Sequence, residues 1–518
     1  MNTKNRPAAR WALHFFTLLG GGLILALLQG CTSLVDLQQC RSNVDCIVGL
    51  GLADSICTSE GRCASVLTAD CPRVIGAALS EDPVLLAHMT KLTGANKVFG
   101  DASEPALTLA LDDFNSSARG GLPIVAGQKA RKLAALICDD EQDAQRAAHH
   151  IVDYLKLQVL IGPVFSQTTI DVAKNVTIPG RTLMINPFSV AEQVADLEPH
   201  GMVFRTAISN REEATGMWLF TKLLINNSIP KLPMMDPAIR IAVIQRPDVY
   251  GRTLGTKYIA QAQVNGCTTS ACRMYVKPFE YPDPQGKASP LTPALLASVA
   301  DFNPTYVVLM GTAEMPSFVI NGLEAEYKKR GLTPPTYLGS EGCKTQALIT
   351  QLGMFPDLKS RVYTFAPRLN ADLDYAFAQH WQSRFPMQTR PDVYGSTGTY
   401  DAAYLIAYAM VGMGDKSLTS SNIVAGINRL VPGPMAPAIS VGTEHMDEAL
   451  KLLSSPGQTI NLTGITSDLD YDLAVGDAPG NYDILCASTA SPSFQTTRVY
   501  FNTKTKALVD LGTFTACQ

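Results

Sequence analysis

Residues 133–163, LAALICDDEQDAQRAAHHIVDYLKLQVLIGP, decide the fold of this chain. The apolar run at 133–138 predicts a buried strand, and the run at 159–161 predicts a second one. Between them, residues 142–155 predict an amphipathic helix, because small and apolar residues recur on one face. These residues are Ala144, Ala148, Ile151 and Leu155. A strand, a helix and a strand of this length are typical of a parallel α/β sheet with a right-handed crossover.

The same alternation extends in both directions along the chain. Further strands are predicted at 74–79, 182–185, 241–244, 306–310, 336–338, 482–486 and 498–501, and helices at 105–115, 253–264, 317–329 and 446–453. Residues 80–100 are predicted to be a loop. The fold class is therefore α/β, and the length fits two such sheets.

One hexapeptide, RPDVYG, occurs at 246–251 and again at 390–395. Six identical residues suggest an internal duplication. A predicted strand precedes the first copy, however, and a predicted helix precedes the second. We therefore expect no structural repeat here.

The N-terminus has the pattern of a secretory signal. Three basic residues precede an apolar stretch at 11–28, and Leu-Gln-Gly-Cys at 28–31 resembles a bacterial lipobox. This pattern predicts removal of residues 1–30 and acylation of Cys31, which would anchor the chain to a membrane. The alternative is an uncleaved membrane helix, because about 18 apolar residues nearly span a bilayer. Thr32 carries no signal for retention in the inner membrane, so the choice between inner and outer membrane stays open.

The charge of the chain argues against nucleic acid as a partner. The formal net charge is −4, and loss of the three basic residues in 1–30 takes it to about −7. Nucleic acids and anionic surfaces bind to basic patches. With 46% hydrophobic and 17% charged residues, the chain is typical of a globular protein.

Twelve cysteines are many for a cytosolic protein and ordinary for an exported one. Cys40, Cys46, Cys57, Cys63 and Cys71 are separated by five, ten, five and seven residues. A zinc site favours closer pairs, so we expect a small disulfide module. Four residues between Cys267 and Cys272 permit a local disulfide. Connectivity within the module, and the partners of Cys138, Cys343, Cys486 and Cys517, stay open.

Motifs for catalysis, cofactors and metals are missing from the sequence. There is no GxSxG, no Walker loop and no GxGxxG after a strand. Asp468, Asp470 and Asp472 alternate as in a calcium loop, but Leu473 stands where that loop needs glycine. We therefore predict no cofactor, no metal and no enzymatic activity.

Several segments, in this order and spacing, resemble those of one family. They are 98–100 before a long helix, 136–140 with paired aspartates, 159–163 leading to Ser166, 183–189, 241–244 leading to Tyr250, 337–342, and 471–477 as a closing turn. Together, over about residues 72–518, they are similar to the type I periplasmic binding proteins of the branched-chain amino acid (leucine-isoleucine-valine) group.

The resemblance implies two α/β lobes joined by three crossings, with a ligand clamped between them. Lobe one would comprise 72–206 and 365–464, and lobe two 207–364 and 465–518. Residues 31–71 would form the added Cys-rich module and linker. The implied function is a solute-binding protein on the outer face of a membrane that serves an ABC importer for an amino acid or a similar small polar ligand. The alternative is a sensor or envelope-assembly regulator of the same fold without a transporter.

The resemblance also implies a ligand site. Ser166 would bind the ligand α-carboxylate, and Glu341 its ammonium group, because an ammonium in a closed cleft needs a countercharge. The other expected ligand-binding residues are Phe99, Phe188, Ser189 and Tyr250. Simple packing or helix capping would also explain some of them, for example a capping pair of Ser189 with Glu192.

Three departures leave the ligand identity open. Ala313 falls where amino acid binders of the family often have an aromatic residue. Phe165 replaces a small residue, and Cys343 follows Glu341 closely.

Overall fold

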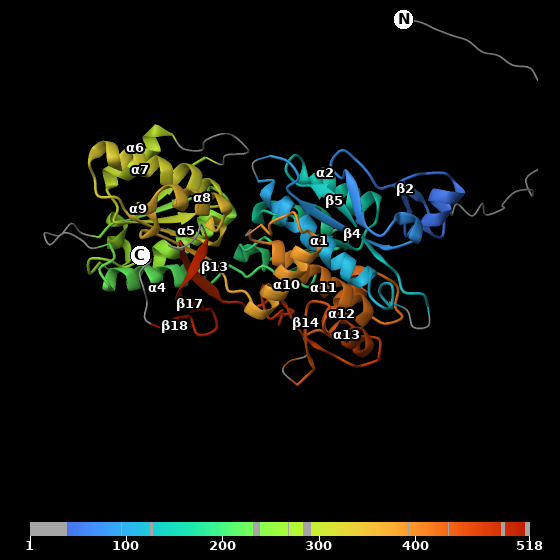
Figure 1. The fold of residues 1–518 in the computed structure, drawn as a ribbon. Coiled ribbons are helices and arrows are strands. Elements are labelled where there is room, and N and C mark those ends of the chain that lie inside the picture. Colours follow the sequence, from blue (N-terminus) through green and yellow to red (C-terminus); the bar gives the residue numbers. More distant parts are fainter. Residues whose placement is uncertain are drawn as a thin grey trace, which may run out of the picture.

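The computed structural model describes residues 39–512 except 95, 125–127, 231–238, 268, 283–291, 392, 432, 434 and 488–492. The predicted signal segment and Cys31 lie outside the described residues. No helix within the described ranges has the length and apolar character needed to cross a membrane. Two α/β lobes stand side by side, and each is built from two separate stretches of the chain (Figure 1).

Lobe one is built on a six-stranded sheet in the order β3-β5-β4-β6-β7-β8. All neighbours are parallel except β3, which runs antiparallel to β5 at the edge. The strands are β3 (Arg73–Gly76), β4 (Val84–Thr90), β5 (Leu133–Asp139), β6 (Val159–Ile161), β7 (Leu183–Asn186) and β8 (Val203–Arg205). The parallel order confirms the prediction made from 133–163.

Helices cover both faces of this sheet. They are α1 (Val98–Asn115), α2 (Ala144–His149), α3 (Ser166–Val172), α10 (Ala371–Arg384), α11 (Ser396–Gly412), α12 (Ser420–Ile427) and α13 (Met446–Leu453). The short strands β14 (Ala438–Ser440) and β15 (Asn461–Thr463) pair beside them. Helix α11 is buried along almost its whole length, between α1, α12 and α13. Its continuous apolar sequence suits this central position.

The prediction of a loop at 80–100 is wrong, because this region contains β4, a central strand of the sheet. His88 interrupts its apolar run and hides the strand signal in the sequence. In the structure the imidazole is fully buried, with Nε2 3.0 Å from Ser103 Oγ. Burial lowers the pKa of His88 to about 4, so the ring is neutral at physiological pH.

Lobe two is built on an eight-stranded sheet in the order β10-β9-β11-β12-β13-β16-β17-β18. The first five strands are parallel, and the last three are added in antiparallel fashion. They are β9 (Ile241–Gln245), β10 (Val276–Glu280), β11 (Tyr306–Met310), β12 (Thr336–Gly339), β13 (Val362–Pro367), β16 (Tyr482–Ala487), β17 (Phe494–Asn502) and β18 (Ala507–Asp510). The helices are α4 (Glu213–Asn226), α5 (Val249–Gln261), α6 (Pro293–Phe302), α7 (Asn321–Arg330), α8 (Gln346–Met354) and α9 (Pro356–Lys359).

The chain passes between the lobes three times. It leaves lobe one after β8 and enters α4 of lobe two at Glu213. It returns between β13 and α10, so this crossing lies near 368–370, slightly beyond the predicted boundary at 365. Ile465, Leu469 and Ala478 still pack in the core of lobe one, which places the last crossing just before β16 and not at 464.

The Cys-rich module forms a small disulfide-bonded unit that packs against lobe one. It contains a helical turn (Asp45–Gly49) and the hairpin β1 (Ser55–Cys57) and β2 (Cys63–Ser65). Its disulfides are Cys40–Cys57 and Cys46–Cys63, while Cys71–Cys138 joins it to β5. Sulfurs bonded in this way are not thiolate ligands for zinc. Cys267 and Cys272 are also bonded to each other, and Cys343 is a buried free thiol.

Candidate functional site

A cavity of about 620 Å³, partly open to solvent, lies between the lobes where their parallel strands end. Open α/β sheets bind ligands at this edge. Lobe one lines it with Val98, Phe99, Val164, Phe165, Ser166, Phe188, Val190, Val393 and Tyr394, and lobe two with Arg246, Asp248, Tyr250, Thr312, Glu341, Gly342, Lys344 and Thr345. Five of the six expected ligand-binding residues thus face one cavity, and Ser189 does not.

Aromatic side chains form the wall contributed by lobe one. The ring of Phe99 packs edge-on against Phe165 at 6.0 Å and against Phe188 at 6.2 Å between centroids. Gly395 lies directly against Phe188, where a Cβ atom would come within 2.1 Å of the ring. Its backbone also has a positive φ of 89°, so glycine is needed there on two grounds. The wall suits an apolar or aromatic ligand group.

Ser166 stands at the start of α3 on the same lobe. Its Oγ accepts a hydrogen bond from the N–H of Ala191 at 3.2 Å, which leaves the hydroxyl hydrogen available to a ligand oxygen. Asp140 fixes the preceding loop, because it accepts a hydrogen bond from the N–H of Val164 at 2.8 Å. Asp140 therefore positions the loop before α3.

Ser189 lies behind the cavity wall and is fully buried. Its Oγ is 2.5 Å from Thr169 Oγ1, and its N–H donates to Asn186 at 2.6 Å. It does not cap the short helical turn at Glu192–Val194, which is preceded by Ala191. In this arrangement the hydroxyl braces the loop that carries Phe188.

Both copies of the RPDVYG hexapeptide reach the cleft, from opposite lobes. The first supplies Arg246 and Tyr250 around the start of α5, and the second supplies Val393 and Tyr394 just before α11. Tyr250 donates a hydrogen bond to Ser340 Oγ at 2.8 Å. Tyr250 was expected at the ligand site, whereas Arg246, Val393 and Tyr394 were not. The tyrosine that both copies share reaches the cavity from each lobe, and this repeated tyrosine was the available signal.

Glu341 is the charged group that stands out in the cavity. Only 2% of the residue is exposed, and its Oε2 is buried without a hydrogen-bond partner. Its N–H donates to Oε1 of Glu213 at 3.0 Å, and Glu213 is also fully buried, with an unpartnered Oε2. Burial, and then the charge of Glu341, raise the pKa of Glu213 well above its usual range, and burial raises the pKa of Glu341 as well. Both shifts favour the protonated form, so burial opposes ionisation of both carboxyl groups at once.

Arg246, a second charged group on this wall, is neutralised by neighbouring acids. It pairs with Asp248 at 2.9 Å and with Glu314 at 3.4 Å. Although burial opposes ionisation, Arg246 and nearby hydroxyl groups hold the pKa of Glu314 below its usual value. The guanidinium also lies 5.1 Å from the ring centre of Phe165, which contacts Lys91 of lobe one at 4.9 Å. Phe165, a departure from the family pattern, therefore bridges the two lobes.

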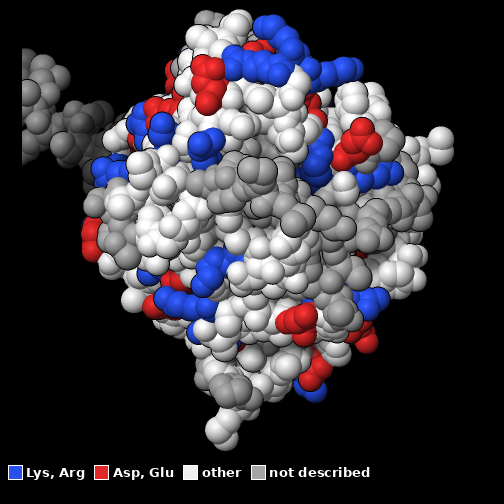
Figure 2. Space-filling model, turned by 90° about the vertical axis from the view of Figure 1, so that its left-hand side faces the viewer, with Lys and Arg blue, Asp and Glu red and all other residues white. Residues whose placement is uncertain are grey.

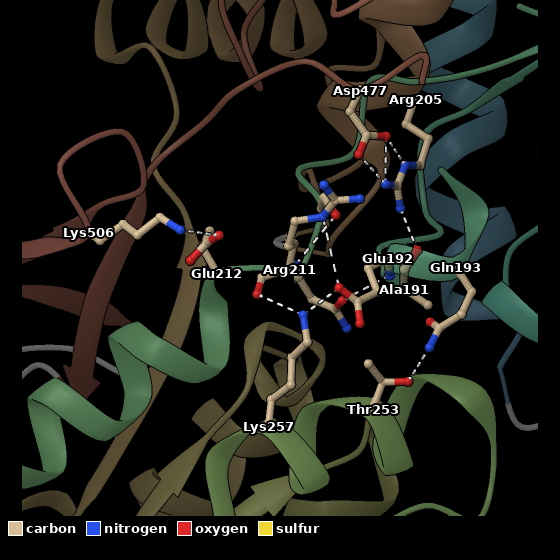
Figure 3. Close-up of polar contacts among 12 residues, drawn as sticks. Ala191, Glu192, Gln193, Arg205, Arg211, Glu212, Thr253, Lys257, Asp477 and Lys506 are labelled. Carbon is tan, nitrogen blue, oxygen red and sulfur yellow. Dashed lines mark hydrogen bonds and ion pairs between the residues drawn. The ribbon is translucent and has the colours of Figure 1, made fainter. Parts of the chain in front are cut away.

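Polar contacts also connect the lobes outside the cavity (Figure 3). Gln193 of lobe one donates to Thr253 of α5 at 2.7 Å, and Lys257 of α5 pairs with Glu192. At the last crossing, Asp477 binds both Nε and Nη2 of Arg205, at 2.7 and 2.6 Å. The Nη1 of Arg205 donates to the carbonyl oxygens of Ser189 and Ala191. This pair connects the crossing to the loop behind the cavity wall.

The surface of lobe two carries mixed charge. Figure 2 shows basic and acidic side chains interspersed on the visible end of the molecule, with no extended basic patch. A nucleic-acid surface would gather Lys and Arg on one face. On this face the structure offers no such surface.

The comparisons with known proteins agree with this architecture. The leucine-binding protein of Thermotoga maritima is similar over 82% of this chain and 99% of its own, with a TM-score of 0.58 and 14% identity. A substrate-binding protein from Desulfitobacterium hafniense in complex with leucine is similar over 80% of this chain and 99% of its own, with a TM-score of 0.51 and 16% identity. A solute-binding protein from Rhodopseudomonas palustris in complex with 3,4-dihydroxybenzoic acid is similar over 84% of this chain and 98% of its own, with a TM-score of 0.56 and 13% identity. At these identities the likeness shows the fold alone.

The sequence comparison identifies the family. No curated protein matches the chain. The sequence model described as periplasmic binding protein, however, matches residues 83–450, well over half of the chain. The match begins just before β4, so the Cys-rich module and β3 precede it. The chain belongs to the periplasmic binding protein family.

Proposed function

We propose that this chain is a lipid-anchored solute-binding protein that closes its lobes on an amino acid with an apolar or aromatic side chain and serves an ABC importer. Membership in the family implies an extracytoplasmic location. The Leu-Gln-Gly-Cys sequence ending at Cys31 supports a lipid anchor. The amino acid assignment rests on the cavity.

The observation that carries this proposal is the unpartnered Oε2 of Glu341 in a cavity between the lobes. Leaving a carboxylate buried without a partner is costly. Neither Glu341 nor Glu213 forms an ion pair with any residue that the structure describes. A ligand ammonium would supply the missing positive charge and a strong hydrogen bond.

The wall from lobe one would receive the rest of the amino acid. Ser166 has a hydroxyl hydrogen to donate to a carboxylate. Phe99 and Phe188 offer apolar surface for the side chain. A ligand held by Ser166 and Glu341 would contact both lobes, and such contacts favour the closed form.

A ligand with a carboxylate as its only charge fits less well. The Rhodopseudomonas palustris neighbour is in complex with such an acid, 3,4-dihydroxybenzoic acid. In this cavity a carboxylate near Glu341 would be repelled, and Arg246 is already paired with Asp248 and Glu314. We therefore expect the amino group to be required.

The second candidate function is a sensor or an envelope-assembly regulator without a transporter. The disulfide-bonded module favours it, because it adds a second surface at the end of lobe one that points away from lobe two (Figure 1). Failure of every small ligand to bind would favour this function.

A thermal-shift screen with matched ligand pairs tests the proposal. Phenylalanine is compared with 3-phenylpropionate, and leucine with 4-methylpentanoate, so that each pair differs only in the amino group. At 100 times its Kd, a one-site ligand adds about 2.7 kcal/mol to the free energy of unfolding, a shift of several degrees in Tm for lobes of this size. We expect the shift only with the amino acids. Equal shifts from both members of a pair would contradict the role of Glu341.

A further inference from the structure

Glu213 has no place in the ligand site expected from the sequence, yet it contacts the central residue of that site. It is the first residue of α4, immediately after the first crossing, and it is fully buried. Its Oε1 accepts the N–H of Glu341 at 3.0 Å. The two residues are 128 positions apart, so only the fold brings them together.

Among the residues that the structure describes, no ion pair is formed with Glu213 or Glu341, although Lys344 lines the same cavity as Glu341. The charge of Glu341 acts on Tyr250 of α5, Tyr394 before α11 and Tyr482 of β16, and also on the Cys343 thiol. Glu314 lies farther off and is paired with Arg246. Arg205, whose charge acts on Tyr394, binds Asp477 at 2.6 Å. Burial raises the pKa of each of these tyrosines above its usual value, so they stay neutral.

We propose that Glu213 and Glu341 share one proton in the empty protein and release it to solvent when a ligand ammonium binds. This inference rests on the proposed function. Before binding, the Glu213 carboxylic acid donates its hydrogen to the Glu341 carboxylate. After binding, two carboxylates surround one ammonium, and the proton has left as H⁺. Two carboxylates and one ammonium together carry one net negative charge. The empty pair, with one carboxylate and one carboxylic acid, carries the same charge.

The sign of the pH dependence follows from this exchange. The shared proton is held tightly in the empty protein, and the ammonium lowers the affinity for it in the complex. At a pH between the pKa of the pair in the complex and its higher pKa in the empty protein, binding of one ligand releases one proton. Affinity therefore rises up to tenfold per pH unit across that window and levels off on either side. A single ionised Glu341 without Glu213 would bind with no such dependence.

Calorimetry with the best amino acid from the screen tests this on the wild-type protein. Titrations at one pH in buffers with different ionisation enthalpies count the protons released, and we expect a value approaching one near neutral pH. In Glu213→Gln the amide can donate to Glu341 as the protonated acid does, but it has no proton to lose. We expect this variant to bind the ligand with a proton count near zero and a flat pH profile.

The shared proton and the proposed function can fail separately. Binding of the amino acid with no proton release, or an unchanged proton count in Glu213→Gln, would overturn the shared proton and leave the proposed function intact. No binding of any amino acid would overturn the proposed function itself. A purely structural role of Glu213 would lower affinity equally at every pH, and the variant's melting temperature checks that it folds.

A second inference comes from the Cys-rich module, which presents an apolar loop to solvent. The loop, residues 44–52, exposes Val44 (39%), Val48 (71%), Leu50 (55%) and Leu52 (44%). No charged residue occurs from Cys46 to Ala53. Exposed apolar patches of this kind mark interaction sites with proteins or membranes.

The loop is held in a fixed frame. The disulfide Cys46–Cys63 ties it to the hairpin, and the N–H of Leu52 donates to the carbonyl of Cys46 at 3.0 Å. Cys71–Cys138 in turn fixes the module to the sheet of lobe one. The apolar side chains are thus presented outward by a rigid body.

We infer that this loop inserts into the lipid surface to which Cys31 is anchored. Gln39, the first described residue, is eight positions after Cys31, and eight residues span at most about 29 Å. The anchor would therefore hold the module at the bilayer surface. The uncharged stretch from Cys46 to Ala53 suits insertion among acyl chains rather than attraction to lipid charge. This inference rests on the lipid anchor of the proposed function.

Photocrosslinking in intact cells tests the contact. A photoreactive phenylalanine analogue replaces Val48 in the full chain, and the matched control replaces Met354, an exposed residue of lobe two. We expect a lipid adduct from position 48 and none from position 354. Crosslinks from position 48 to another protein, or only to residues 32–38 of the same chain, would overturn the inference. Mass measurement of the Cys31 peptide in the same sample shows separately whether the anchor exists.

Discussion

Glu341→Gln is expected to weaken the binding of an amino acid ligand at least thirtyfold. The substitution keeps the shape of the side chain and removes the charge that would face the ligand ammonium. Loss of a buried charge partner costs about 2–5 kcal/mol, and about 1.4 kcal/mol is a factor of ten in Kd. Titration calorimetry with the best ligand measures the change.

Ser166→Ala serves as the matched control on the opposite lobe. It removes one hydroxyl donor, and a hydrogen bond to a charged group contributes about 1.5–3 kcal/mol. We therefore expect a smaller loss of affinity than for Glu341→Gln. If Glu341→Gln binds the amino acid as tightly as the wild type, the ammonium does not lie at Glu341, and a neutral or acidic ligand would be indicated.

The second large effect is expected at the last crossing between the lobes. Arg205 is 1% exposed, and Asp477 binds two of its nitrogens. Asp477→Ala would leave a buried guanidinium without its counter-ion, which typically costs about 3–5 kcal/mol. We expect a fall in Tm of several degrees, and weaker ligand binding as well, because Arg205 also holds the carbonyl of Ala191 behind the cavity wall.

The control for this variant is Lys506→Ala. Lys506 pairs with Glu212 at 2.9 Å beside the same region, but its side chain is mostly exposed (Figure 3). Exposed ion pairs contribute about 0–1 kcal/mol. Differential scanning calorimetry should therefore separate the two variants clearly. Equal melting temperatures would show that Arg205–Asp477 contributes no more than a surface pair.

Regular alternation made most of the fold predictable from the sequence. Short apolar runs such as 159–161 can only be buried strands when amphipathic helices flank them, and the structure has them as such. The failure at β4 has a local cause. His88 is a polar residue in the middle of the strand, and its presence argues against a buried strand in the sequence. In the fold, its two ring nitrogens form hydrogen bonds with Ser103 and with the carbonyl of Ile161.

The site was partly predictable for a different reason. Ser166, Tyr250 and Glu341 each follow a strand, and the carboxyl ends of parallel strands meet at one edge. Nothing in the sequence marks Glu213 as a site residue, because it follows Glu212 as the first residue of an ordinary helix. It contacts Glu341 only because of the packing within lobe two. Ser189 follows a strand too, but its side chain turns toward Thr169 and not toward the cavity. Side-chain direction within a loop depends on such contacts.

A crystal structure of the protein with its best amino acid ligand tests the central claim most directly. We expect a ligand between the lobes, with its nitrogen about 2.7–3.2 Å from a carboxylate oxygen of Glu341 and its carboxylate beside Ser166. A ligand bound in the reverse orientation, with its carboxylate toward lobe two, or bound outside this cavity, would contradict it.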